Sequence, residues 1–287
     1  MTQTSSSEAG LVGVAAVTDR SDGGWKLLWR EGKLALFGGT VIILVVLASL
    51  LIPEISPFDP FEQDLFGRLN PPGWVDDLGL THWMGTDSLG RDVATRVFVG
   101  ARLSLFISAT SVLGAMVIGT AAGLVAGFRG GLIDDALMRL VDVQLSFPIV
   151  LLALALVAVV GPSAGNVILV FILTGWPIYA RTVRASTLTL RSRDFVEAAV
   201  GLCARSTTIL RRHILPNALG PLTVVATFEL AKVLIFESSL SFLGLGVQPP
   251  NPTWGNMMAD GHSFLEDAWW INFFPGVVLV ITAATAN

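Results

Sequence analysis

Residues 34–52 read LALFGGTVIILVVLASLLI, a run of 19 residues without a charged side chain between Lys33 and Pro53. A helix needs about 20 predominantly apolar residues to cross the hydrocarbon core of a bilayer. This run therefore predicts a transmembrane helix, and it decides the class of fold in which the rest of the chain is interpreted.

The composition of the whole chain agrees with a membrane protein. Of the 287 residues, 53% are hydrophobic and 14% are charged, and the mean hydropathy is +0.69. An ordinary soluble domain is about 45–50% apolar and about 25% charged. The composition excludes a disordered chain, a fibrous repeat and a water-soluble globule, and a net charge of −4 does not favour nucleic-acid binding.

Five further apolar runs predict spans over 103–128, 136–160, 167–180, 219–243 and 269–287. With the first run they predict an all-α integral membrane protein with six transmembrane helices. Thirteen of the 18 Lys and Arg residues fall in segments that are cytoplasmic if the N-terminus is inside. The positive-inside rule therefore predicts that both termini are cytoplasmic.

The spans divide the chain into segments of different composition. We expect a disordered cytoplasmic tail over 1–24, and a basic interfacial helix leading into the first span over 25–52. An external loop is predicted over 53–102, and a membrane core over 103–287. The core contains the longest inner loop, 181–215, whose arginines are already explained by the positive-inside rule.

A stripe of small residues recurs every four positions along the second predicted span. Its members are Ser111, Ala115, Gly119, Gly123 and Gly127, which share one face of a helix. Small residues allow two helices to approach closely within a membrane. We therefore expect this face to pack against another helix, with a substrate groove as the alternative.

The inner loop carries the signals of a structured helix pair. Asp194 is expected to cap a helix, with Glu197 three residues later in a variant of the capping box. Ser206 is expected to cap a second short helix over 207–215 that ends at Pro216. A rigid helix pair between two spans would form a surface through which a cytoplasmic partner could exert force on the spans.

The same loop contains Glu197-Ala198-Ala199 and then, after Ile209, residues 212–217 (RHILPN). This order resembles the EAA loop of the membrane subunits of ATP-binding-cassette (ABC) importers. Residues 85–92 (GTDSLGRD) and 239–250 (SLSFLGLGVQPP) are similar to segments of the dipeptide/oligopeptide/nickel permeases of the C-subunit type.

The resemblance implies a type I ABC importer permease of MetI-like architecture in the bacterial inner membrane. Implied partners are a homologous permease subunit in a heterodimer, two cytoplasmic ABC ATPases, an extracytoplasmic substrate-binding protein and membrane lipid. The chain would have no catalytic residue, no metal site and no cofactor, since ATP and Mg²⁺ belong to the ATPases. Alternating access would couple to ATP hydrolysis through eight residues: Asp194, Glu197, Ala198, Ala199, Gly201, Cys203, Arg212 and His213.

Two features depart from the family pattern. The family usually has glycine six residues after the glutamate, where this chain has Cys203, while Gly201 lies two residues earlier. Because a positive φ is costly for cysteine, the turn is expected either to be an ordinary one or to have shifted to Gly201. The family's last helix continues into a polar tail, whereas this chain stops at Asn287, which predicts truncation.

The fifth predicted span contains Glu229 and Lys232, three residues apart and able to pair. A charge at mid-bilayer depth is costly, so we expect either a self-neutralised pair against a neighbouring subunit or groups that line the substrate path. Asp142 in the third span is a further candidate for the path.

The cargo is expected to be a dipeptide or oligopeptide, with nickel or haem-like ligands as the alternative. An ion-coupled secondary transporter is the alternative from another class, with Glu229, Lys232 and Asp142 as its relay.

Overall fold

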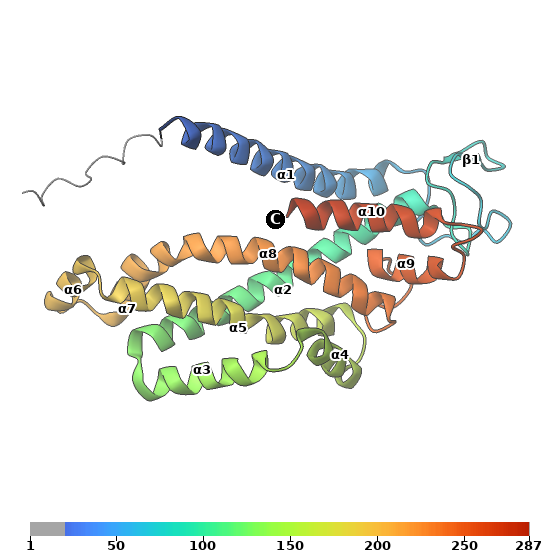
Figure 1. The fold of residues 1–287 in the computed structure, drawn as a ribbon. Coiled ribbons are helices and arrows are strands. Elements are labelled where there is room, and N and C mark those ends of the chain that lie inside the picture. The colour runs from blue at the N-terminus through green and yellow to red at the C-terminus, as the bar shows by residue number, and fades with distance from the viewer. Residues whose placement is uncertain (1–20, 287) are drawn as a thin grey trace, which may run out of the picture.

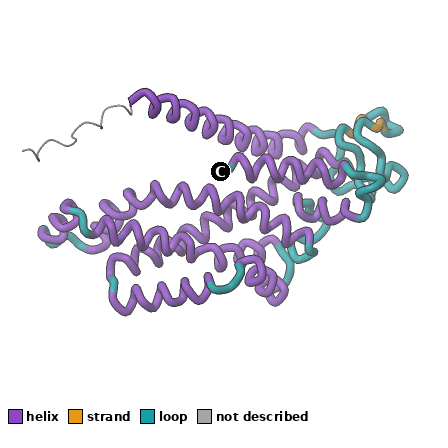
Figure 2. Tube along the Cα trace, viewed as in Figure 1, coloured by secondary structure: helices purple, strands orange, loops and turns teal. Residues whose placement is uncertain are grey.

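The computed structural model describes residues 21–286, and helices make up most of the chain (Figure 1). Figure 2 shows loops gathered at one end of the long helices, around a single two-stranded sheet. In chain order the elements are α1 (Ser21–Ile55), β1 (Trp74–Val75), β2 (Thr81–His82), α2 (Val93–Arg129), α3 (Gly131–Leu145), α4 (Ile149–Val160), α5 (Ala164–Arg191), α6 (Asp194–Gly201), α7 (Ser206–Ile209), the π-helical turn η1 (Leu210–Ile214), α8 (Leu215–Phe242), α9 (Trp254–His262) and α10 (Trp270–Thr285).

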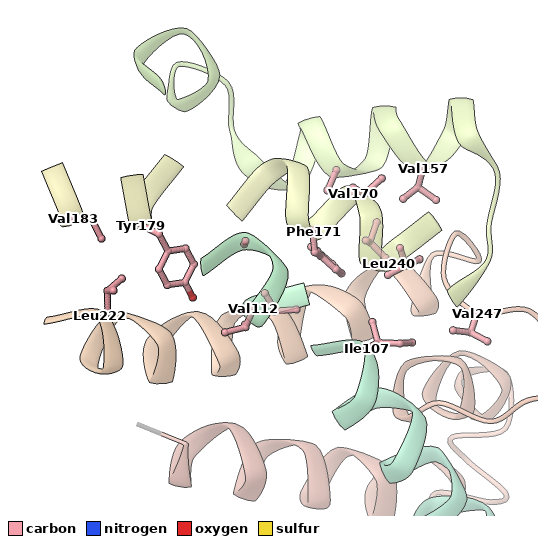
Figure 3. Packing of buried hydrophobic residues seen from close by; sticks show 14 residues of the cluster. Ile107, Val112, Val157, Val170, Phe171, Tyr179, Val183, Leu222, Leu240 and Val247 are labelled. Carbon is pink, nitrogen blue, oxygen red and sulfur yellow. The ribbon is translucent and has the colours of Figure 1, made fainter. Parts of the chain in front are cut away.

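The main hydrophobic core lies where α2, α5 and α8 meet. Figure 3 shows Val112 of α2, Phe171 of α5 and Leu240 of α8 directed toward one another, and all three are buried. Val157 of α4 completes the cluster from the side. The three long helices therefore form the central body against which the other elements pack.

Each of the six predicted spans contains an apolar helix. Within residues 21–286, four helical segments are long and apolar enough to cross a membrane: 36–55, α2, α5 and 206–242. The pair α3 and α4 makes a fifth if it is counted as one span, and α10 is a shorter apolar helix. With 16 residues, α10 is about 24 Å long.

The third predicted span, 136–160, is not one helix. The axes of α3 and α4 differ by 88° across the break between Leu145 and Ile149. Pro148 lies in this break and disfavours helical φ and ψ at Phe147 before it. A hydropathy run cannot detect such a bend because the mean over 136–160 stays apolar, although α4 is far more apolar than α3.

The first span and its basic lead-in form one helix. α1 runs without a break from Ser21 to Ile55, so residues 21–24 of the predicted tail are helical, while residues 1–20 lie outside the described part. α1 contacts α2 and α10, and its N-terminal end extends away from them in Figure 1. Only 11% of its apolar window 36–55 is buried.

Two helices extend beyond the predicted span boundaries. α2 begins at Val93, ten residues before the predicted start, because Asp92 caps it by accepting from the Thr95 amide at 2.7 Å. Its early arginines have partners within the protein, among them the carbonyl of Pro60, which accepts from Arg96 at 2.9 Å. α5 continues to Arg191 and so includes the first third of the predicted inner loop.

The GTDSLGRD segment, residues 85–92, forms a folded turn at the start of α2. Asp87 is buried and its carboxylate lies 2.7 Å from Nε of Arg91 and 3.4 Å from Nε of Arg96. The indole of Trp270 donates to the carbonyl of Thr86 at 3.0 Å and so joins the turn to α10. The charges of this segment therefore organise the loop end of the molecule.

Candidate functional site

The inner loop forms the predicted helix pair, but its first helix starts differently. α6 begins at Asp194, and the capping position is occupied by Arg193 without a side-chain cap bond. The prediction that Asp194 caps the helix is therefore wrong. Asp194 and Glu197 instead lie in the first turn, where negative charge interacts favourably with the helix dipole.

The end of α6 is a Schellman turn centred on Cys203. The Cys203 amide donates to the carbonyl of Val200 at 2.9 Å, and the Ala204 amide donates to Ala199 at 3.1 Å. Cys203 has a φ of 56°, in the left-handed region. Both sequence expectations were wrong: the turn keeps its positive φ at position 203, and Gly201 is the last residue of the helix.

The second helix does not end at Pro216. α7 starts at Ser206 with Arg205 in the capping position, so Ser206 is not the cap. The chain then continues through η1 into α8, with the Leu215 amide bonded to the carbonyl of Leu210, five residues back. A π turn changes the hydrogen-bond register just before the proline, and Pro216 then lies in the first turn of α8, where its missing N–H is tolerated.

One side of the helix pair is anchored in the helix bundle. Val196, Ile209 and Ile214 are at most 1% exposed and pack with Leu124 and Phe128 of α2. A displacement of α6 would therefore be transmitted to α2 and to α8, with which the pair is continuous.

The other side of the pair is exposed and partly apolar. Three apolar side chains of α6 and of the residue after it, Phe195, Val200 and Leu202, are 44%, 56% and 84% exposed; we call them the α6 patch. Phe195 and Leu202 lie seven residues apart, a helical spacing that excludes the buried Val196 and was the available sequence signal for the patch. Of the eight predicted coupling residues, Ala199 and His213 are half-buried, and the exposed ones are Asp194, Glu197, Ala198, Gly201, Cys203 and Arg212.

The small-residue stripe of α2 lies directly against α5. A β-carbon at Gly119 would lie 2.4 Å from the carbonyl oxygen of Trp176, and one at Gly127 would lie 2.7 Å from Cβ of Thr187. Ser111 and Ala115 are buried on the same face. The stripe is therefore occupied by a neighbouring helix of the same chain and offers no groove along this face.

Glu229 and Lys232 form an ion pair within α8. The Glu229 side chain is 10% exposed and that of Lys232 is 37% exposed. The pair neutralises both charges locally, which lowers the cost of placing them in the middle of a span. The ammonium is the more accessible member of the pair.

Two of the three acidic residues of α3 pair with arginines of α5. Arg184 makes two contacts with the Asp134 carboxylate, at 2.5 and 2.7 Å. Arg181 contacts Asp142 at 2.5 Å, and both of these side chains are more than half exposed. Asp142 thus pairs with α5, whereas Glu229 pairs within α8, and the three candidate path residues belong to two separate ion pairs.

A buried carboxylate near the end of α8 joins this helix to α2. Glu237 is fully buried and accepts from Ser104 at 3.1 Å and from Ser241 at 2.8 Å. Ser104 lies on α2, so the carboxylate bridges two core helices. The serine-rich composition around it was the available signal.

Two family models match the chain. Residues 119–287 match the model described as binding-protein-dependent transport system inner membrane component. Residues 25–72 match the N-terminal transmembrane domain of oligopeptide transport permease C.

Curated proteins similar to the chain are permease proteins. The Di/tripeptide transport system permease protein DppC of Pseudomonas aeruginosa is 38% identical over 265 residues, which cover 91% of this chain and 88% of that protein. Dipeptide transport system permease proteins DppC of Alkalihalophilus pseudofirmus and Haemophilus influenzae are 37% and 34% identical, over 90% of this chain and 86% and 88% of theirs.

A solved structure has a related fold. A chain of the inward-facing MetNI methionine ABC transporter, in its native CY5 crystal form, superposes with a TM-score of 0.54 at 21% identity. The match covers 67% of this chain and 91% of that one.

Proposed function

This chain belongs to the family of binding-protein-dependent transport system inner membrane components, and from this we propose that it is a permease subunit of an ATP-driven peptide importer. It forms half of the translocation pathway, and a homologous permease subunit forms the other half. The observation that carries the proposal is similarity along about nine-tenths of the chain to dipeptide permease proteins. The relatives named above give no support to nickel or haem-like cargo or to an ion-coupled secondary transporter.

The subunit acts without catalytic chemistry of its own. It is a multi-pass protein of the inner membrane, and the distribution of Lys and Arg supports cytoplasmic termini. ATP and Mg²⁺ bind to two partner ATPases, and an extracytoplasmic binding protein delivers the peptide. Lipid surrounds the apolar outer faces of the helices.

The ATPase docks on the exposed side of α6. The α6 patch offers apolar area, and the exposed side chains of Asp194, Glu197 and Arg212 offer polar contacts beside it. The buried anchors of the helix pair, Val196 and Ile209, transmit the motion to α2. Closure of the ATPase dimer would thereby move the spans between inward-facing and outward-facing arrangements.

Glu229 and Lys232 are the candidates for contact with cargo in the path. The support for this role is the partly exposed Lys232 ammonium, which could attract a peptide carboxylate. The alternative is a pair that only neutralises itself against the neighbouring subunit. Asp142 is the third candidate, and its exposed pairing with Arg181 leaves it accessible.

Transport in vesicles tests the proposed function. The full complex, with its partner permease, both ATPases and the binding protein, is reconstituted into proteoliposomes, and uptake of a labelled dipeptide is followed. We expect uptake that requires ATP and stops when a non-hydrolysable analogue replaces it. Uptake driven by a proton gradient without ATP would contradict the proposal, and a labelled nickel chelate serves as the control cargo.

A further inference from the structure

Two of the transmembrane helices contain a proline whose missing N–H is compensated from another helix. Pro53 lies in the last turns of α1 and Pro177 in the middle of α5. A proline inside a helix cannot donate to the carbonyl four residues before it. The carbonyls of Ser49 and Leu173 therefore lack their usual donor, and in a bilayer no bulk water replaces it.

At Pro177 the donor comes from α3. The Gln144 side-chain amide donates to the carbonyl of Leu173 at 2.7 Å and to that of Thr174 at 3.2 Å. Its oxygen accepts from the indole of Trp176 at 3.0 Å. The amide group of Gln144 is thus directed at the turn of α5 that contains Pro177.

At Pro53 the donor comes from α2. Nε of Arg102 donates to the carbonyl of Ser49 at 2.5 Å, and Nη2 donates to that of Leu50 at 2.8 Å. Nη2 also contacts Glu54 at 3.1 Å. The guanidinium therefore bonds to the same turn that the proline interrupts.

The two sites share one geometry. In each, a side chain from a neighbouring helix donates to the carbonyls four and three residues before the proline. Pro221 in α8 and Pro275 in α10 also lie inside helices. The side-chain hydrogen bonds that the structure describes include none to the corresponding carbonyls of Asn217 and Ile271, in contrast to Ser49 and Leu173.

Both places join a peripheral element to the central body of α2, α5 and α8. In α3 only Asp134 and Val141 are buried, and α1 is mostly exposed. Gln144 also lies directly before the break that separates α3 from α4. With so few buried contacts, the interhelical hydrogen bonds contribute much of what fixes these elements in place.

We propose that Gln144 and Arg102 are positioning residues. Gln144 fastens the broken third span to α5 at the carbonyl that Pro177 leaves without a donor, and Arg102 fastens α1 to α2 at the carbonyl that Pro53 leaves without a donor. The fastening by Gln144 determines where the bend before α4 lies relative to α5. The role of the bend's location in transport rests on the proposed function, whereas the hydrogen bonds that fasten α3 and α1 do not depend on it.

A double-mutant cycle on the assembled complex tests the fastening. Gln144→Met keeps the length of the side chain and removes its donor, and we expect a fall in Tm of about 2–4 °C. In the Pro177→Ala background the fall should be smaller, because residue 177 then supplies the N–H to Leu173, while the loss of the acceptor for the Trp176 indole is common to both backgrounds. Pro275→Ala is the control background and should leave the fall unchanged.

The same cycle applies to Arg102→Met in the Pro53→Ala background. Equal falls in Tm with and without the proline would overturn the fastening at either site. So would a Gln144→Met effect that Pro275→Ala reduces as much as Pro177→Ala does.

Peptide uptake separates positioning from stability. We expect Gln144→Met to slow ATP-driven uptake several-fold. We expect the stable Gln144→Met/Pro177→Ala complex to remain slow, because the end of α3 beside the break is still detached from α5, while the ion pairs of Asp134 and Asp142 hold the rest of α3. Recovery of uptake together with Tm would overturn the positioning role. If the unmodified complex carried no peptide, the proposed function would fail while the Tm cycle would still test the fastening.

Discussion

A β-carbon added at Gly123 would lie 2.5 Å from the carbonyl oxygen of Ala180. The two residues face each other across the contact between α2 and α5, the most extensive helix contact in the described part of the chain. Because the obstructing atom belongs to the backbone, it cannot move aside as the end of a flexible side chain could. The distance between the two helices is therefore set by the absence of a side chain at position 123.

Gly123→Ala should destabilise the protein by separating α2 from α5. Overpacking of a tight contact typically costs about 1–3 kcal/mol, so the midpoint of thermal unfolding in detergent should fall. Gly165→Ala is the matched control, since a β-carbon there meets no atom within 4 Å. An equal effect at both positions would mean that the tight contact is not the cause.

Cys203→Gly should stabilise the inner loop. A non-glycine residue in the left-handed region costs roughly 1–2 kcal/mol, and Cys203 has a φ of 56°. Cys203→Val should have the opposite effect because a β-branched residue fits that region poorly. Hydrogen exchange at the amides of residues 194–204 measures both, and faster exchange in Cys203→Gly would contradict the expectation.

Leu202→Asp should weaken binding of the ATPase subunit without unfolding the permease. Leu202 is 84% exposed within the α6 patch, so a charge there would be desolvated only in the complex. We expect at least a tenfold loss in co-purification, which corresponds to about 1.4 kcal/mol. Val75→Asp, on an exposed strand residue at the other end of the molecule, should leave co-purification unchanged.

Removing one member of the Glu229–Lys232 pair should destabilise the protein, and removing both should restore most of its stability. Glu229→Gln leaves the ammonium of Lys232 without its partner inside the span, and the loss of stability should be about 1–3 kcal/mol. Adding Lys232→Met removes the unpaired charge and should restore most of it. If the stable double variant transports dipeptides normally, the pair neutralises itself and does not contact cargo.

Asp134 and Asp142 offer a matched comparison of buried and exposed pairing. Asp134→Ala breaks a two-contact pair whose carboxylate is 11% exposed, and it should cost about 1–3 kcal/mol. Asp142→Ala breaks a pair whose members are 64% and 52% exposed, and it should cost about 1 kcal/mol or less. Thermal unfolding measures both; normal uptake by the Asp142→Ala complex would exclude Asp142 from the path.

The residues that sequence reasoning located well are those whose signal is local. Periodicity along α2 identified Gly119, Gly123 and Gly127 as one face, and the apolar runs identified the spans. The helix pair of the inner loop was located because its motif residues lie close together in the sequence, and its coupling role stays a prediction. The prediction at Cys203 was wrong because the cost of a positive φ was weighed alone, without the two backbone hydrogen bonds that close the Schellman turn there.

The amino-acid sequence by itself determined that this is a membrane protein with six apolar segments, because the bilayer requires long uncharged runs whatever their arrangement. Only the tertiary structure decided which segments are bent and which side chains meet. Pro53 and Pro177 each leave a carbonyl vacant, but the donors that reach those carbonyls, Arg102 and Gln144, are distant in sequence. Such pairings depend on how the helices pack, and hydropathy along the chain contains no information about that packing.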